Sequence, residues 1–179
     1  MWGKRGLRGS DLETLIEFTN EKYAKLGLCR VDKIATPVKV AEIDGNGVIT
    51  RGFFEKKSTV DFIGIIQGVF VAFDAKETNL KSLPLSNIHP HQVDYMSDVI
   101  AQGGLAFLIV HFKSVHRYFL VPFSVLREYM PQGSIASHAG KRKSIPFSEM
   151  DRCIEIEYCM SDHTLAYLDA LNRLVTYEE

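Results

Sequence analysis

The sequence has few of the features that mark secreted, zinc-binding or membrane proteins. Its only cysteines are Cys29, Cys153 and Cys159, an odd number with no CxxC spacing. This argues against a disulfide framework and against a zinc site. No apolar run reaches the about 20 residues that span a bilayer, and the basic N-terminus leads into a polar helix start rather than the apolar core of a signal peptide. We therefore expect a cytoplasmic protein without a membrane segment.

An excess of charge of either sign is also absent. The 21 basic and 22 acidic residues give a formal net charge of −1, which argues against a protein that binds DNA through bulk positive charge alone. The basic residues are nevertheless clustered along the chain. The clusters are Lys4, Arg5 and Arg8, then Lys56 and Lys57, then Lys141, Arg142 and Lys143. We therefore expect any phosphate-binding surface to be local.

Internal repeats and low-complexity tracts are lacking too, which favours a single domain over residues 1–179. The expected elements are a helix over 11–26, a strand over 28–35, β-hairpins over 37–54 and 60–78, a helix over 91–102, strands over 105–112 and 115–121, a short helix after Pro122, a strand over 153–158 and a C-terminal helix capped near Ser161. Because 37–54 is rich in polar residues, this hairpin is expected to protrude. The order of elements predicts an α/β fold with a mixed β-sheet flanked by helices.

The second hairpin, VDFIGIIQGVFVAFDAKET at 60–78, is mostly apolar yet contains two carboxylates and an ammonium. Because side chains alternate along a strand, Asp74 and Lys76 share one face. If the Gln67-Gly68 dipeptide forms a two-residue turn, Asp61 lies directly opposite Asp74. Like charges opposite each other destabilise a sheet, so this arrangement needs a reason.

A divalent cation would supply that reason. Asp61 and Asp74 provide hard oxygen ligands of the kind that Mg²⁺ prefers, and Thr59 adds a hydroxyl opposite Lys76. The Lys76 ammonium can reach a phosphate oxygen or a metal-bound water. This set of residues indicates a site for phosphodiester hydrolysis. The residues alone leave open a plainer alternative, a salt bridge at the rim of an ordinary hairpin.

An Asp, a dozen residues and then Asp-x-Lys resembles the metal-site signature of the PD-(D/E)xK nuclease superfamily. More specifically, the chain resembles the RecU-type Holliday junction resolvases of Gram-positive bacteria and their phages. The segments that carry the resemblance are RGLRGSDLE near the start, STVDFIGIIQGVFVAFDAKET in the middle, NIHPHQ at 87–92 and GKRKSIPF at 140–147. They follow the expected order and span most of the chain. The resemblance implies a restriction-endonuclease-like sheet with the 37–54 hairpin as a stalk.

The resemblance also implies a chemistry and a substrate. By position, it implies four metal ligands, Thr59, Asp61, Asp74 and Gln92. Lys76 would then stabilise the transition state, with Mg²⁺ as the cofactor, for which Mn²⁺ can substitute. The resemblance implies a homodimer whose stalk inserts into four-way junction DNA and which resolves the junction by paired symmetric nicks in recombination and repair. Recombinase and branch-migration proteins are further candidate partners.

Three features depart from the family pattern. Val60 stands in place of the proline in the superfamily's name, a proline that the RecU family commonly lacks. Asp74 stands where Glu is usual in RecU, so the distance to a metal can differ. The net charge of −1 is low for an enzyme that acts on DNA.

Other residues are weaker candidates. Glu13 completes a capping-box pattern with Ser10, and as a carboxylate it is also a secondary candidate for the metal cluster. Gln92, taken alone, is more typical of a residue that caps its helix. In a junction-binding protein, the basic clusters become contacts to DNA phosphates. These candidate DNA contacts are Lys4, Arg5, Arg8, Lys56, Lys57, Lys141, Arg142 and Lys143.

Two other functions remain open from the sequence. The first is a related metal-dependent nuclease that acts on other branched or linear DNA. The 37–54 hairpin distinguishes this nuclease from a junction resolvase, because deleting its tip should abolish a preference for junctions and leave the metal site intact. The second is a non-catalytic junction-binding protein on the same fold. That function predicts that Asp74→Ala behaves like the wild type.

Overall fold

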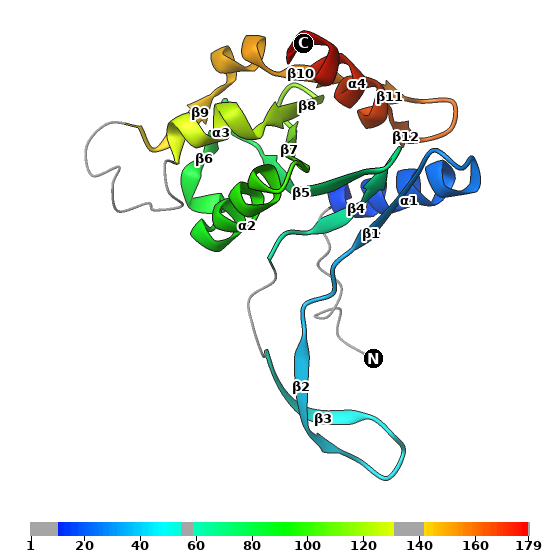
Figure 1. The fold of residues 1–179 in the computed structure, drawn as a ribbon. Coiled ribbons are helices and arrows are strands. Elements are labelled where there is room, and N and C mark those ends of the chain that lie inside the picture. Colours follow the sequence, from blue (N-terminus) through cyan, green and yellow to red (C-terminus); the bar gives the residue numbers. More distant parts are fainter. Residues whose placement is uncertain (1–10, 55–58, 131–141, 179) are drawn as a thin grey trace.

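A computed structural model describes residues 11–54, 59–130 and 142–178 (Figure 1). Six strands form the central sheet: β1 (Cys29–Lys33), β4 (Phe62–Ile66), β5 (Val69–Thr78), β7 (Leu105–Phe112), β8 (Arg117–Pro122) and β10 (Ile154–Ile156). Their order across the sheet is β1-β4-β5-β7-β8-β10. The central pair β5 and β7 is parallel, and the other neighbouring pairs are antiparallel. The predicted mixed sheet is therefore confirmed.

Helices cover both faces of this sheet. They are α1 (Asp11–Lys25), α2 (Pro90–Ala101), α3 (Phe123–Tyr129) and α4 (Tyr167–Glu178). The core that packs against α2 and α3 contains Ala72 of β5, and the core that packs against α1 and α4 contains the next residue, Phe73. Because both faces are covered, β5 and β7 read as nearly continuous apolar runs. None of the described helices is long and apolar enough to cross a membrane.

On the α1 side, three stacked rings fill the centre of the core. Phe62, Phe73 and Phe107 come from β4, β5 and β7, and neighbouring ring centroids are 5.0 Å and 4.7 Å apart. All three side chains are fully buried. Stacked aromatic pairs add a favourable contact to the burial of their apolar area. This row of rings packs β4 onto β5 and β5 onto β7 on this face of the sheet.

The first helix forms close to where the sequence predicts it. Acidic residues lie in the first turn of α1 and basic residues in its last turn, which suits the helix dipole. The helix ends where Gly27 adopts a φ of 69°, a value that glycine tolerates without strain. The N–H of Leu28 then donates to the carbonyl of Tyr23 at 3.0 Å, which closes the helix end.

The polar hairpin of the sequence pairs as two strands, β2 (Val38–Ile43) and β3 (Ile49–Phe54). Figure 1 shows it projecting away from the sheet, as predicted. Asp44 stabilises its tip, because Oδ1 accepts the N–H groups of Asn46 and Val48, both at 2.9 Å. We call this hairpin the stalk.

The prediction of a C-terminal helix capped near Ser161 is wrong. The predicted strand over 153–158 divides instead into β10 and β11 (Tyr158–Cys159), and β11 pairs with β12 (Thr164–Leu165) before α4 begins at Tyr167. The Tyr23 hydroxyl of α1 donates to the carbonyl of Leu165 at 2.8 Å and holds this small hairpin to the body. A contact between residues so far apart in the chain leaves no local sequence signal.

Four short elements complete the description: β6 (Ser82–Pro84), η1 (Leu85–Asn87), β9 (Ser144–Pro146) and η4 (Phe147–Arg152). The strands β6 and β9 form a two-stranded ladder beside the main sheet.

Cys29, Cys153 and Cys159 are free thiols, which agrees with the expectation from their number and spacing.

Candidate active site

The turn between β4 and β5 sets the register of the site. Its two residues have a φ of 49° at Gln67 and 89° at the following glycine, values typical of a two-residue type I′ turn. Phe62, the first residue of β4, consequently pairs with Phe73. The adjoining residues, Asp61 and Asp74, face each other, as the sequence predicts.

Each of these carboxylates accepts a hydrogen bond from a backbone N–H group on the opposite strand segment. Oδ1 of Asp74 accepts the N–H of Asp61 at 2.9 Å, and Oδ2 of Asp61 accepts the N–H of Ala75 at 3.0 Å. Such bonds to ionised groups are among the stronger hydrogen bonds in proteins. They orient the two side chains and leave Oδ1 of Asp61 and Oδ2 of Asp74 outside the reciprocal pair.

The remaining oxygen of Asp74 lies beside a lysine. Asp74 is fully buried, and its Oδ2 is 2.5 Å from Nζ of Lys76, whose side chain is 13 % exposed. This contact has the distance of an ion pair but not the geometry of a hydrogen bond, and Oδ2 has no hydrogen-bond partner among the described residues. Lys76 therefore balances the charge of this oxygen, which keeps a lone pair for a further ligand.

Burial is the main cause of an unusual pKa at Asp61. Together with the negative charge of the facing Asp74, it raises the pKa of Asp61 from 3.8 to about 7. Lys76 and the N–H of Ala75 act in the opposite direction. Two carboxylates that share a poorly solvated site cannot both ionise easily, so without a cation the pair retains a proton close to neutral pH.

We expect the metal-free protein to lose thermal stability as the pH rises from about 4 to about 7. The folded state holds the Asp61 proton more tightly than the unfolded chain does, so this stabilisation is complete below the unfolded pKa and lost through the folded pKa. The expected fall in Tm is about 5–10 °C for a chain of this size. Thermal melts in EDTA across this range measure it. Asp61→Asn should lack this part of the pH dependence, and an unchanged slope in that variant would contradict the assignment.

The oxygen atoms of this site fit a hard divalent cation. Within residues 11–54, 59–130 and 142–178, no three His, Cys, Asp or Glu side chains gather closely enough to hold a metal. Mg²⁺, however, binds through one or two carboxylates and keeps several waters. A cation between the carboxylates would bind Oδ2 of Asp74, where Lys76 Nζ now lies, and would offset the repulsion that raises the pKa of Asp61. The residues present therefore suit Mg²⁺ better than zinc, which prefers Cys and His.

The structure gives positions for the other two predicted ligands. Thr59 is exposed and lies two residues before Asp61. Gln92 lies in the first turn of α2, is 5 % exposed, and its Oε1 accepts the N–H of His89 at 2.9 Å. The amide thus caps its helix. An amide oxygen has two lone pairs, so this hydrogen bond leaves Gln92 with capacity for a metal.

The secondary candidate Glu13 is engaged elsewhere. It lies on α1, and its carboxylate forms an ion pair with Nζ of Lys33 at 3.0 Å. Glu17, one turn further along the helix, is 3.5 Å from the same ammonium. Glu13 thus links α1 to the edge strand β1. Its predicted capping partner, Ser10, lies outside the described residues.

Two of the predicted DNA contacts lie in the described residues. The others, Lys4, Arg5, Arg8, Lys56, Lys57 and Lys141, lie outside them. Arg142 contacts the Tyr129 side chain at the end of α3. Lys143 is exposed, and its carbonyl accepts the N–H of Leu85 at 3.0 Å. Lys143 therefore lies beside the segment that leads from β5 to α2, and Arg142 lies against the end of α3.

Sequence patterns missed two features of this region. One is the reciprocal bonding of the carboxylates to backbone N–H groups, which the predicted register could have suggested. The other is Tyr129, which lies in an apolar helix and reads as an ordinary core residue. Its contact with Arg142 joins two segments whose proximity no periodicity or turn signal indicates.

Comparison with known proteins identifies the family of this chain. The family described as Recombination protein U, RecU, matches residues 7–173. The chain is 36 % identical over 177 residues to the Holliday junction resolvase RecU of Lactococcus lactis subsp. lactis, covering 94 % of this chain and 79 % of that relative. It is 34 % identical over 177 residues to the protein of the same name from Lactiplantibacillus plantarum, covering 95 % and 83 %.

Among solved structures, Hjc, a Holliday junction resolvase from Archaeoglobus fulgidus, aligns with a TM-score of 0.44 and 11 % identity, covering 77 % of this chain and 93 % of that chain. The sequence matches are much stronger, because they extend over nearly the whole chain at more than 30 % identity. This chain belongs to the RecU family.

Proposed function

We propose that this chain is a Mg²⁺-dependent endonuclease that resolves four-way DNA junctions. The observation that carries the proposal is the buried pair of Asp61 and Asp74, held face to face by backbone N–H groups with Lys76 beside it. A protein that only bound junctions would have no need for opposed carboxylates that lower its stability. RecU relatives named as Holliday junction resolvases support the choice of substrate.

Each residue of the site has a separate role in this proposal. Asp61 and Asp74 would hold the metal, and Thr59 and Gln92 would complete its coordination. When bound, a divalent cation polarises the scissile phosphate and lowers the pKa of water. The N–H groups of Asp61 and Ala75 keep the carboxylates oriented, so little reorganisation is needed when the ion arrives.

Lys76 would change partners during the reaction. In the structure its ammonium lies against Asp74, and a bound cation would weaken that attraction by neutralising the carboxylate. The ammonium could then stabilise negative charge that develops on a phosphate oxygen. A water oxygen would bond to phosphorus and give up a proton to solvent, while the bond to the 3′ oxygen breaks and that oxygen takes a proton from solvent, leaving 5′-phosphate and 3′-hydroxyl ends.

A homodimer would place two such sites on one junction. A four-way junction has twofold symmetry, so an isologous dimer can nick two strands symmetrically. The stalk carries many exposed apolar side chains, which is unusual for a hairpin that serves only as a connection. These residues are Val38, Val40, Ile43, Val48, Ile49 and Phe53. They support the role of the stalk as a contact surface.

The experiment that tests this function is cleavage of a synthetic four-way junction and of a linear duplex with the same sequence. We expect cleavage of the junction in Mg²⁺ or Mn²⁺ and none in EDTA. Lys76→Ala should lower kcat by about 10³-fold with little change in junction affinity, because its charge acts mainly in the transition state.

Three results would contradict the proposal in different ways. Cleavage in EDTA would exclude the metal mechanism. Equal cleavage of both substrates would favour a nuclease of other specificity. Junction binding without cleavage would favour a non-catalytic junction-binding protein.

A further inference from the structure

Arg142 is held against the side chain of Tyr129. Its Nη1 donates to the Tyr129 hydroxyl at 3.1 Å, and its Cζ lies 5.3 Å from the centroid of the ring. Tyr129 is 1 % exposed and belongs to the core between the sheet and α2 and α3. Arg142 is itself exposed. A surface guanidinium is therefore fixed by a residue whose own position the core determines.

This contact leaves the guanidinium able to bind an anion. The group has five N–H donors, and the bond to Tyr129 uses one of them. Burial raises the pKa of Tyr129, so its hydroxyl stays neutral and serves as an acceptor for Arg142. The Tyr129 ring also lies within cation–π distance of the guanidinium, so two contacts restrict the position of this group, whose planar fork suits bidentate binding of a phosphate.

The backbone next to Arg142 is fixed by the ladder of β6 and β9. The two strands have similar sequences, SLPLS at 82–86 and SIPFS at 144–148, and they pair antiparallel. Their ends are bonded alike, since Leu85 N–H donates to Lys143 O at 3.0 Å and Phe147 N–H to Lys81 O at 3.1 Å. The central side chains of both strands are fully buried. Arg142 therefore precedes a rigid segment.

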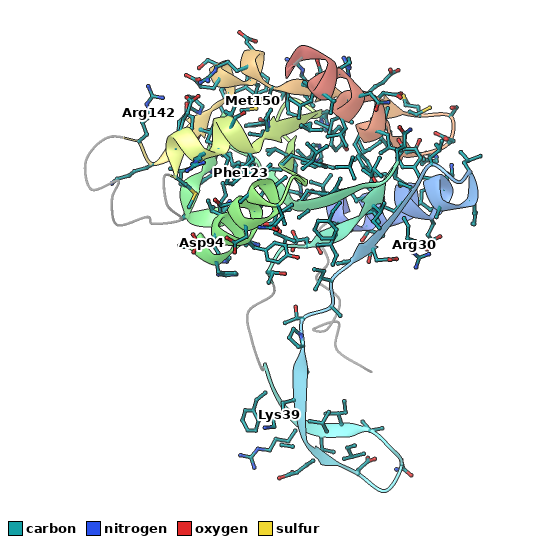
Figure 2. All side chains as sticks on the ribbon, in the orientation of Figure 1. Arg30, Lys39, Asp94, Phe123, Arg142 and Met150 are labelled. Atoms are coloured by element: carbon teal, nitrogen blue, oxygen red, sulfur yellow. The ribbon has the colours of Figure 1, made fainter. Side chains whose placement is uncertain are left out.

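The same ladder is joined to the strand that carries Lys76. Thr78, on the same face of β5 as Lys76, donates through Oγ1 to the carbonyl of Ser82 at 3.1 Å and accepts the N–H of Leu80 at 3.0 Å. This short turn connects the end of β5 to β6. Figure 2 shows Arg142 at the margin of the body on this side of the molecule. The strand that carries Lys76 is thus linked through the β5–β6 turn to the ladder that Arg142 precedes.

We infer that Tyr129 is a positioning residue that orients the Arg142 guanidinium toward a DNA phosphate beside the cleavage site. The inference rests on the proposed function. An oriented guanidinium loses less conformational freedom on binding than a free side chain does, so the contact contributes more to affinity. The contact between Arg142 and a phosphate would also help to place the neighbouring scissile phosphate next to the carboxylates of Asp61 and Asp74.

A double-mutant cycle tests the inference. Junction affinity is measured with Ca²⁺ in place of Mg²⁺ for the wild type, Tyr129→Phe, Arg142→Ala and the double variant. Arg142→Ala should weaken binding about tenfold and reduce the slope of log K against log salt by about one, as expected for one phosphate contact. Tyr129→Phe keeps the core ring and should weaken binding about threefold, the value of one hydrogen bond. The double variant should bind like Arg142→Ala.

Two controls separate positioning from stability. Tyr23→Phe removes another tyrosine hydroxyl, the one that donates to Leu165 O at 2.8 Å, and should leave junction affinity unchanged. Arg142→Lys leaves the core untouched and keeps the charge but lacks the planar fork, so it should weaken binding several-fold while preserving the salt slope.

Additive effects of Tyr129→Phe and Arg142→Ala would overturn the inference. Wild-type affinity in Arg142→Lys or in Arg142→Ala would overturn it as well. Failure of the wild type to prefer the junction over duplex would overturn the proposed function instead, so the two failures are distinguishable.

Discussion

Asp74→Asn should reduce junction cleavage by at least about 10³-fold while the metal-free protein remains as stable as the wild type or becomes more stable. The substitution removes a negative charge from a fully buried position opposite Asp61, and the Asp61 carboxylate, which Lys76 also attracts, can balance the ammonium that loses its ion pair with Asp74. The asparagine oxygen can still accept the N–H of Asp61, so the local backbone should not change. Activity and stability therefore move in opposite directions, as is typical of residues kept for function rather than for folding.

The measurement for Asp74→Asn combines single-turnover cleavage of the junction with thermal melts in EDTA. Asp32→Asn is the matched control, because Asp32 lies on β1 with a side chain that is 59 % exposed and paired with Arg30. That control should leave cleavage unchanged. If Asp74→Asn lost stability as well as activity, the carboxylate would have a structural role. If it cut normally, the proposed mechanism would be wrong.

Shortening the stalk should abolish the preference for four-way junctions without damaging the active site. In the structure Lys39 pairs with Phe53, and β2 and β3 continue beyond them to the tip. Replacing residues 40–52 by Asn-Gly would close this pair with a type I′ turn. The ratio of junction to duplex cleavage should fall by about 10²-fold, which corresponds to about 3 kcal/mol of lost junction contacts.

The state of the metal site in the shortened protein can be checked independently. Its Tm in EDTA should show the same fall with rising pH as the wild type, because that fall depends on Asp61 and Asp74 in the sheet. Glu42→Gln, which disrupts only the ion pair with Arg51 on the stalk, is a matched control that should keep most of the junction preference. A shortened protein that still preferred junctions would show that the stalk does not recognise the substrate.

Much of the fold could be predicted because its signals are local. The α1 helix lies where its capping pattern, helical periodicity and terminal glycine indicated, and the stalk turns where Asp44 begins a run of turn residues. The small hairpin of β11 and β12 could not be predicted. It depends on packing against α1, and in isolation residues 158–165 carry polar groups that suit a helix start equally well.

The sequence by itself determined the pairing of Asp61 with Asp74 and the placement of Lys76 on the same face, because a two-residue turn and the alternation of side chains fix both. Only the tertiary structure decided that Asp74 is fully buried, that the pKa of Asp61 rises to about 7, and that Tyr129 holds Arg142. The physical reason is that burial and electrostatics depend on every element packed around a group. Here α2, β7 and the β6–β9 ladder come from distant parts of the chain.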